Sequence, residues 1–377
     1  MKRFFSIIGL EFRTIFRDEG VLLVLVGALL LYSALYGLIY EPEVVRDMPV
    51  AVVDMDSSPA SQELTRALDA TPAAHVAYTC GSLEQARVLF LEGKVCGVML
   101  IDKDYQKNQL AGLVSSVSVY ADGSYFLLYS GLLGAVSDVV LARGAQLSEQ
   151  RIGELSPLNY KIEMLYNPYG GYASALLPAV LIVILQQVLL IGIGMLMGSC
   201  NEFNHWKRYD GSSALTITMG KALSYVIIYI PLCFYLFWID YKLFHYPVSN
   251  TSEWEVVAFL LPYLLSVIFL GITLGAIFRR RESAILYLAV FSVFLIMISG
   301  ISWPGEGMPE WLFYGGRIMP SSSAIDGFVR LRTAGASLVD VSSQWLILWA
   351  LTFVFATTAV LAVSRARLLR GGATNQK

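Results

Sequence analysis

Charged residues are scarce in this sequence. Of its 377 residues, 15% are Asp, Glu, Lys or Arg and 56% are hydrophobic, whereas a soluble domain typically carries about 25% charged residues. Six windows contain no charged residue, and each comes close to the roughly 20 apolar residues that a membrane-spanning helix needs. They are residues 21–40, 172–201, 222–239, 256–278, 283–305 and 341–364. Because buried helices of soluble proteins rarely run so far without a charge, the sequence predicts an α-helical membrane protein with six transmembrane helices.

Motifs for nucleotide hydrolysis are also missing. No GxxxxGK[ST] phosphate loop occurs, because Gly220-Lys221 lacks both the upstream glycine and the following Ser or Thr. There is no GxSxG or HExxH either, so we expect no enzyme. The apolar windows contain no Asp, Glu, Lys, Arg or His, and Asp240 lies just beyond the third. Ion-coupled transporters usually keep such groups at depth, so this scarcity counts against ion-coupled transport.

Cysteine and histidine are too few and too scattered to suggest a metal site. The three histidines lie in three different regions, and no CxxC pair is present. Two of the four cysteines, Cys80 and Cys96, fall between the first and second windows. In an oxidising compartment they could form a disulfide, and two unpaired thiols are an equally good interpretation. The net charge of −2 gives no sign of nucleic-acid binding.

Fourteen of the 27 Lys and Arg residues lie in short segments that six alternating spans place on one side. They are Lys2, Arg3, Arg13, Arg17, Lys207, Arg208, Lys221, Arg279, Arg280, Arg281, Arg365, Arg367, Arg370 and Lys377. Cytoplasmic loops carry this excess in membrane proteins, so the pattern predicts that both termini are cytoplasmic. Residues 365–377 would form a cytoplasmic tail.

Residues 1–19 show a helical repeat of apolar side chains. The repeat consists of Phe5, Ile8, Phe12, Ile15 and Phe16, with basic and polar residues opposite. This pattern is typical of an amphipathic helix that lies in the cytoplasmic interface, followed by a first span at 20–40. The alternative is that the helix simply extends the first span.

Residues 41–171 differ from the rest of the chain because charges and short strand-like runs return. Residues 49–54, 94–101 and 116–120 read as strands, while 58–68 and about 124–149 read as helices. Ser58 is placed to cap the first of these helices. We therefore predict an extracytoplasmic α/β domain with a small, partly parallel sheet, inserted between the first two spans. Residues 172–364 would hold the other five spans.

Two segments between spans, residues 201–221 and 303–335, have distinctive compositions. Residues 201–221 would form a cytoplasmic link, in which aromatic and charged side chains could dock a partner or serve as a membrane-interface belt. Its candidate docking residues are Phe203, Trp206, Lys207, Arg208 and Tyr209. Residues 303–335, with Pro and Gly breaks around aromatic residues, predict a re-entrant or interfacial excursion on the outer face; a plain loop is the alternative.

The order of several motifs resembles the ABC-2 type transporter permeases, in particular the subgroup with a large periplasmic domain between helices 1 and 2. The resemblance rests on PVAVVDMDSSPASQELTRAL, LEGKVCGVMLIDKDY, YNPYGGYASALLPAV and SGISWPGEGMPEWLFYGGRIMPSSSAIDGFVRL. The link at 201–221 follows the family outline from Trp206 to Ser213, with Ala214 where an acidic residue is usual.

The resemblance implies the permease subunit of an ABC exporter in the bacterial inner membrane. It would move a hydrophobic or amphiphilic substrate, such as a drug or lipid, using ATP and Mg held by a separate ATPase subunit. Arg280 and Glu282 would join the ATPase-coupling residues, and a second permease copy or a paralogue, membrane lipid and a periplasmic adaptor are candidate partners. Gln186 and Gln187 in the second span could line the substrate pathway or hold helices together. The rival hypothesis is a membrane-anchored receptor or scaffold, whose outer domain binds a ligand or an envelope partner.

Overall fold

The computed structural model describes residues 2–40, 45–111, 113, 115–121, 126–152, 172–246, 248, 251–299, 301 and 307–371. The chain divides into two compact units. The helical unit comprises Met1–Glu41 and Met164–Lys377, and the insert unit comprises Pro42–Glu163. The division falls within the limits of 41–171 expected for the inserted domain.

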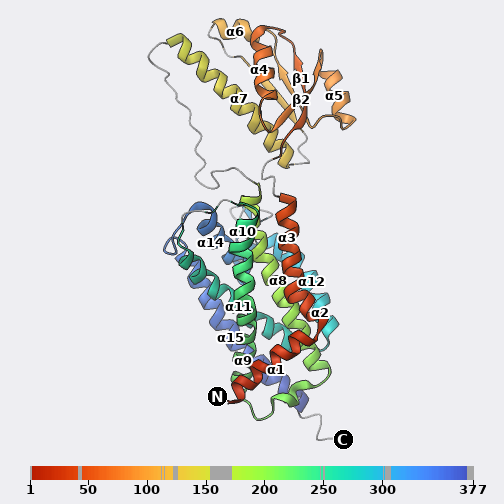
Figure 1. The fold of residues 1–377 in the computed structure, drawn as a ribbon, viewed down its shortest axis with the longest axis vertical. Coiled ribbons are helices and arrows are strands. Elements are labelled where there is room, and N and C mark those ends of the chain that lie inside the picture. Colours follow the sequence, from red (N-terminus) through yellow and green to blue (C-terminus); the bar gives the residue numbers. More distant parts are fainter. Residues whose placement is uncertain are drawn as a thin grey trace. The chain divides into compact units, whose positions relative to one another are not determined.

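Six helices among the described residues are long and apolar enough to cross a membrane, as the charge-free windows predicted. They span Glu19–Tyr40, Leu176–Glu202, Ala214–Leu243, Glu253–Ile277, Arg281–Ile298 and Ser342–Leu369. The second and fourth are 72% buried, whereas the first and fifth are only 22% and 18% buried. The second and fourth therefore form the centre of the helical unit, and the first and fifth lie at its surface (Figure 1).

The first span is not a straight extension of the amino-terminal helix. Helix α1 (Lys2–Arg17) ends before Asp18, whose backbone is extended. The Asp18 side chain then accepts a hydrogen bond from the Val21 N–H and caps α2 (Glu19–Leu22), which continues into the π-helix η1 (Leu23–Ala28) and α3 (Leu29–Tyr40). A capping aspartate at this elbow explains why the chain changes direction there.

Of the other spans, the third is built from three consecutive segments and the rest are single helices. The second is α8 (Tyr172–Glu202), which is followed by the 3₁₀-helix η2 (His205–Tyr209). The third runs through α9 (Ala214–Phe234), η3 (Tyr235–Ile239) and α10 (Asp240–Leu243). The last three are α11 (Glu253–Ile277), α12 (Arg281–Ile298) and α15 (Ser342–Gly371).

The region 303–335 contains two helices, α13 (Glu310–Gly316) and α14 (Pro320–Ala334). Trp303, Pro304 and Gly305, part of the expected break, lie outside the described residues. Helix α14 packs against α8, α11 and α15 and buries Ile325, Phe328 and Leu331. This much burial is unlike a plain solvated loop.

The insert unit contains a four-stranded, partly parallel sheet. Its strands are β1 (Met48–Asp54), β2 (Ala74–Cys80), β3 (Gly97–Ile101) and β4 (Val117–Ala121), in the order β2-β1-β3-β4. Strand β1 pairs in parallel with both β2 and β3, and β4 runs antiparallel to β3. The helices of the unit are α4 (Pro59–Asp69), α5 (Leu83–Leu91), α6 (Tyr105–Ala111) and α7 (Phe126–Ile152).

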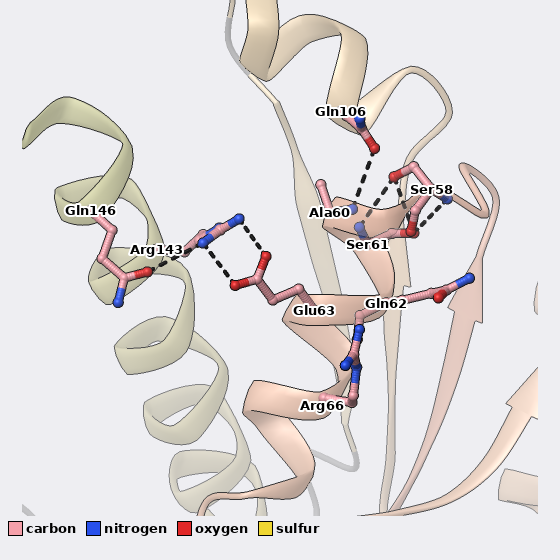
Figure 2. Close-up of polar contacts among 9 residues, drawn as sticks. All are labelled: Ser58, Ala60, Ser61, Gln62, Glu63, Arg66, Gln106, Arg143 and Gln146. Atoms are coloured by element: carbon pink, nitrogen blue, oxygen red, sulfur yellow. Dashed lines mark hydrogen bonds and ion pairs between the residues drawn. The ribbon is translucent and has the colours of Figure 1, made fainter. Parts of the chain in front are cut away.

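Helices cover both faces of this sheet, which explains the continuous apolar run of β1. Val50 and Val52 pack with α4 and α7, whereas Ala51 and Val53 pack with Ala86 of α5. Polar contacts also hold α4 in place (Figure 2). Arg143 of α7 donates to both carboxylate oxygens of Glu63, at 3.0 and 2.6 Å, and the Ala60 N–H donates to Gln106 of α6.

The possible Cys80–Cys96 disulfide is wrong for this structure, because both thiols are free. Cys80 ends β2, and the Cys96 N–H donates to the Pro49 carbonyl just before β3. Strand β1 therefore lies between the two cysteines. Two strand spacings amount to roughly 9.5 Å, which exceeds the roughly 7 Å over which a disulfide can join two Cα atoms.

Candidate functional site

The link at 201–221 folds into a short, well-capped turn between α8 and α9. Asn204 adopts the left-handed conformation, at φ 50°, which Asn tolerates better than most residues. The 3₁₀-helix η2 follows, and Ser213 then caps α9 by accepting a hydrogen bond of 3.1 Å from the Thr216 N–H. Below, the part of this link from Asn201 to Ser213 is called the coupling segment.

Two aromatic residues of the coupling segment point into the helical unit. Trp206 is 3% exposed and Tyr209 is 5% exposed. The Trp206 indole N–H donates to Asn201 Oδ1 at 2.8 Å. The sequence prediction placed both rings on a docking surface; instead, they anchor the segment from beneath.

Asn201 ties the coupling segment to the turn between α11 and α12. Its amide nitrogen donates to the carbonyl oxygens of Gly275, Ala276 and Phe278, at 3.3, 3.2 and 2.6 Å. The last carbonyls of a helix have no partners within the helix, so one buried amide satisfies several of them. The Arg281 N–H also donates to Glu202 Oε2 at 3.3 Å. The two links therefore form one continuous surface.

The remaining predicted coupling residues face outward on this surface. Phe203 is 65% exposed, and Lys207, Arg208, Arg280 and Glu282 are exposed as well. The structure thus brings five of the seven predicted residues to one exposed surface, which we call the double-loop surface.

A buried ionic cluster that the sequence analysis missed lies beneath the coupling segment. Lys221 Nζ is 2.5 Å from Glu11 Oε2, and the side chains are 3% and 1% exposed. The hydroxyls of Tyr209 and Tyr225 donate to Glu11 Oε2 and Oε1, at 3.3 and 2.8 Å. Buried charges are costly unless they are paired and hydrogen-bonded, and this cluster meets both conditions.

The cluster fixes helix α1 on the coupling segment and α9. The ammonium group of Lys221 also lies 5.1 Å from the centre of the Tyr209 ring. Burial raises the pKa of the Tyr209 hydroxyl well above its ordinary value, so it stays a neutral hydrogen-bond donor. A sequence signal for the cluster exists: Glu11 lies midway between Ile7 and Ile15, at the four-residue spacing of one helix face.

A second ion pair fixes the elbow after α1 to the start of α12. Arg281 donates to both carboxylate oxygens of Asp18, at 2.6 and 2.8 Å. Burial acts to raise the pKa of Asp18, but the hydrogen bonds from Arg281 and the Val21 N–H outweigh it and hold that pKa below 3.8. The amino-terminal helix, the coupling segment and the α11–α12 turn are therefore linked by direct polar contacts.

The two glutamines of the second span have different surroundings. Gln186 is fully buried, donates to Ser321 Oγ at 3.0 Å and accepts from the Ser321 N–H at 2.9 Å. It therefore joins α8 to α14, as the interpretation of glutamine as interhelical glue requires. Gln187 is half-buried, and neither of its amide atoms has a hydrogen-bond partner among the described residues.

The architecture defines the class of this molecule as a multi-pass membrane protein with a small α/β unit inserted after its first span. Comparison with known proteins agrees with this class. The sequence model of one family, described as "ABC-2 family transporter protein", matches residues 20–361. The chain therefore belongs to the ABC-2 family and is the membrane subunit of an ABC transporter, a type of permease that works with an ATPase subunit.

A curated relative supports the same family. The chain is similar to a protein of Bacillus subtilis (strain 168) named "Linearmycin resistance permease protein LnrN". The two are 22% identical over 376 residues, which cover 90% of this chain and 94% of the relative.

Proposed function

We propose that this chain is the permease subunit of an ABC exporter whose double-loop surface docks a separate cytoplasmic ATPase. The subunit would carry a hydrophobic or amphiphilic compound out of the cytoplasm or the inner leaflet. The observation that carries this proposal is the exposed group of Phe203, Lys207 and Arg208, joined through Asn201 to the turn that bears Arg280.

The contacts beneath the double-loop surface give the docked ATPase a route to the spans. When ATP and Mg²⁺ close the ATPase subunits, a rigid push on the coupling segment would be passed to α1 through the Tyr209–Glu11 hydrogen bond and to α12 through the Arg281–Glu202 hydrogen bond. Outward transport is supported by the relative's name, which describes a resistance permease.

A second copy of the permease, or a paralogue, would complete the pathway. The first and fifth spans are the least buried, and α12 exposes Tyr287, Val290 and Phe294 by 64%, 59% and 62%. Helix α8 contacts both α3 and α12, and it carries the unsatisfied Gln187. Pairing through α3 and α12 would place the amide of Gln187 near the interface, where it could meet substrate.

The docking proposal is tested by the variant Phe203→Ala/Lys207→Ala. We expect the two truncations together to remove at least about 1.4 kcal/mol of binding energy. Because that amount corresponds to a factor of ten in affinity, co-purification with the ATPase and stimulation of ATP hydrolysis should fall at least tenfold. Leu243→Ala/Lys242→Ala is the matched control, since it removes an exposed apolar residue and an exposed lysine from the opposite end of the third span. Unchanged stimulation in the first variant would remove the docking surface from the proposal.

We further propose that the insert unit lies outside the cytoplasm and that both termini lie inside, in the bacterial inner membrane. Lys103 is exposed on the insert unit, so a cysteine placed there in a chain lacking its four native cysteines reports the orientation. An impermeant thiol reagent should label Lys103→Cys in intact spheroplasts. Labelling only after the membrane is permeabilised would reverse the orientation.

A further inference from the structure

A cleft of about 720 Å³ lies at the elbow between α1 and α2, beside the coupling segment. Three arginines line it from two separate elements: Arg13 and Arg17 come from α1, and Arg208 comes from η2. Thr14 and the carboxylates of Asp18 and Glu19 also reach the cleft.

Among the charged side chains of the cleft that have no ion-pair partner, the positive ones outnumber the negative ones. Arg13, Arg17 and Arg208 are exposed, and their side chains make no hydrogen bond or ion pair within the part of the chain that the structure describes. Asp18 is neutralised by its two bonds to Arg281. Glu19 is then the one carboxylate of the cleft lining without an ion pair, set against three guanidinium groups.

The position of the cleft on α1 indicates where its ligand comes from. The face of α1 that carries Ile7, Glu11 and Ile15 is buried, while Phe5 and Phe16 on another face are 66% and 57% exposed. Exposed aromatic residues on an amphipathic helix insert into the membrane interface, and arginines on the polar face of such a helix then lie at the level of the lipid phosphates. Basic pockets at the cytoplasmic ends of spans are suited to anionic headgroups.

We propose that this cleft binds the phosphate of an anionic phospholipid headgroup, held by Arg13, Arg17 and Arg208. Guanidinium groups match phosphate oxygens in planar, paired geometry, which favours arginine for this role. The bound headgroup would join α1 to the coupling segment at the surface, above the buried pair of Glu11 and Lys221. Arg208 belongs to both this cleft and the double-loop surface, whereas Arg13 and Arg17 belong to the cleft alone. The test therefore changes only Arg13 and Arg17, so that failure of the headgroup site and failure of the docking proposal can be told apart.

The test measures lipid binding to the full chain purified in a neutral detergent. Phosphatidylglycerol is titrated in, and bound lipid is counted by native mass spectrometry, with phosphatidylcholine as the uncharged comparison. We expect wild-type protein to prefer phosphatidylglycerol and Arg13→Ala/Arg17→Ala to bind it about 30-fold more weakly, because each basic residue near an anionic lipid surface contributes about 1 kcal/mol. Arg279→Ala/Arg365→Ala is the control, since it removes two other exposed arginines with the same change in net charge.

Three results would overturn the proposal. Equal loss of phosphatidylglycerol in both double variants would show a general charge effect. Full displacement of the lipid by millimolar inorganic phosphate would identify a site for a soluble anion. Unchanged lipid binding, together with lost ATPase co-purification in Arg13→Ala/Arg17→Ala, would assign the cleft to an acidic segment of the ATPase. A loss confined to Arg13→Ala/Arg17→Ala, with both variants monodisperse, supports the headgroup site.

Discussion

At the scale of single residues, the most consequential feature is the buried ion pair of Glu11 and Lys221, which could not be predicted from the sequence. Lys221 precedes an apolar window and looks like one more cytoplasmic basic residue, yet its side chain is 3% exposed and bound to Glu11. Pairing between residues 210 positions apart depends on tertiary packing. The helical periodicity of residues 7–15 places Glu11 on one helix face, but no local sequence pattern identifies Lys221 as its partner.

Removing one member of this pair should be far more damaging than removing both. In Lys221→Met the carboxylate of Glu11 remains buried without its counter-ion, a change that typically costs about 3–5 kcal/mol. We expect a large fall in the thermal midpoint measured by fluorescence-detected size exclusion in detergent. Glu11→Gln/Lys221→Met should recover much of the loss, because the amide can still accept a hydrogen bond from Tyr225. If the double variant is no more stable than the single one, the two charges do not stabilise each other.

The elbow pair should make stability depend on pH in acid. Because the pKa of Asp18 in the folded protein lies below its ordinary 3.8, its contribution is complete above that ordinary value and is lost as the pH falls through the lower folded value. Asp18→Asn should therefore cost about 1 kcal/mol at pH 6, a modest amount for a partly exposed pair. The difference from wild type should begin to shrink as the pH falls below 3.8 and should vanish only below the lower folded pKa. A difference in thermal midpoint that stays constant from pH 6 to pH 3 would contradict this assignment.

At the scale of elements, the type of most helices and strands could be predicted from the sequence, but the faces that they present could not. A helix does form at the expected amino-terminal position, but of the predicted apolar repeat only Ile15 lies on the buried face of α1. Ser58 does cap α4, where Ser61 completes a capping box. Caps and periodicity are local, so they can be read from the chain.

The coupling segment shows where local patterns stop being informative. Trp206 and Tyr209 look like exposed anchors in a polar stretch, but their burial depends on α1 and α9 packing beneath them. Exposure of an aromatic ring in a short turn is decided by distant elements. The five exposed docking candidates and the two buried rings therefore could not be separated from sequence.

The close approach of α1 to α9 is made possible by a glycine. A Cβ atom added to Gly220 would lie 2.8 Å from Ile7 Cγ2, so Gly220→Ala should destabilise the helix pair by about 1–3 kcal/mol through overpacking. The fall in thermal midpoint should be reversed in part by adding Ile7→Ala, which makes room.

Gly9→Ala is the control for this prediction, because nothing lies within 4 Å of the Cβ position of Gly9 on the same pair of helices. That substitution should be neutral or stabilise by roughly 0.5–1 kcal/mol, as alanine favours a helix interior over glycine. Equal effects at Gly9 and Gly220 would mean that the close contact has no influence on stability.

At the scale of the whole molecule, the charge-free windows were enough to predict the six apolar helices and the division into two units. Each unit has a hydrophobic core of its own, so each unit could be predicted separately from the hydrophobic pattern of its own part of the sequence. The order in which spans pack was not predictable. The burial of α8 and α11, and the exposure of α12, come from helix packing among spans that are all uniformly apolar.

That exposure leads to a prediction about assembly. Val290 of α12 and Val257 of α11 are both exposed valines on apolar spans, by 59% and 45%. If two copies pair through α12, a cysteine at position 290 meets its symmetry mate across an isologous interface, whereas one at position 257 faces lipid. In a chain lacking the four native cysteines, Val290→Cys should give a disulfide-linked dimer on mild oxidation in membranes, and Val257→Cys should remain monomeric. Because both residues have the same side chain and lie in similar apolar surroundings, random collision would cross-link them equally, and that result would exclude pairing through α12.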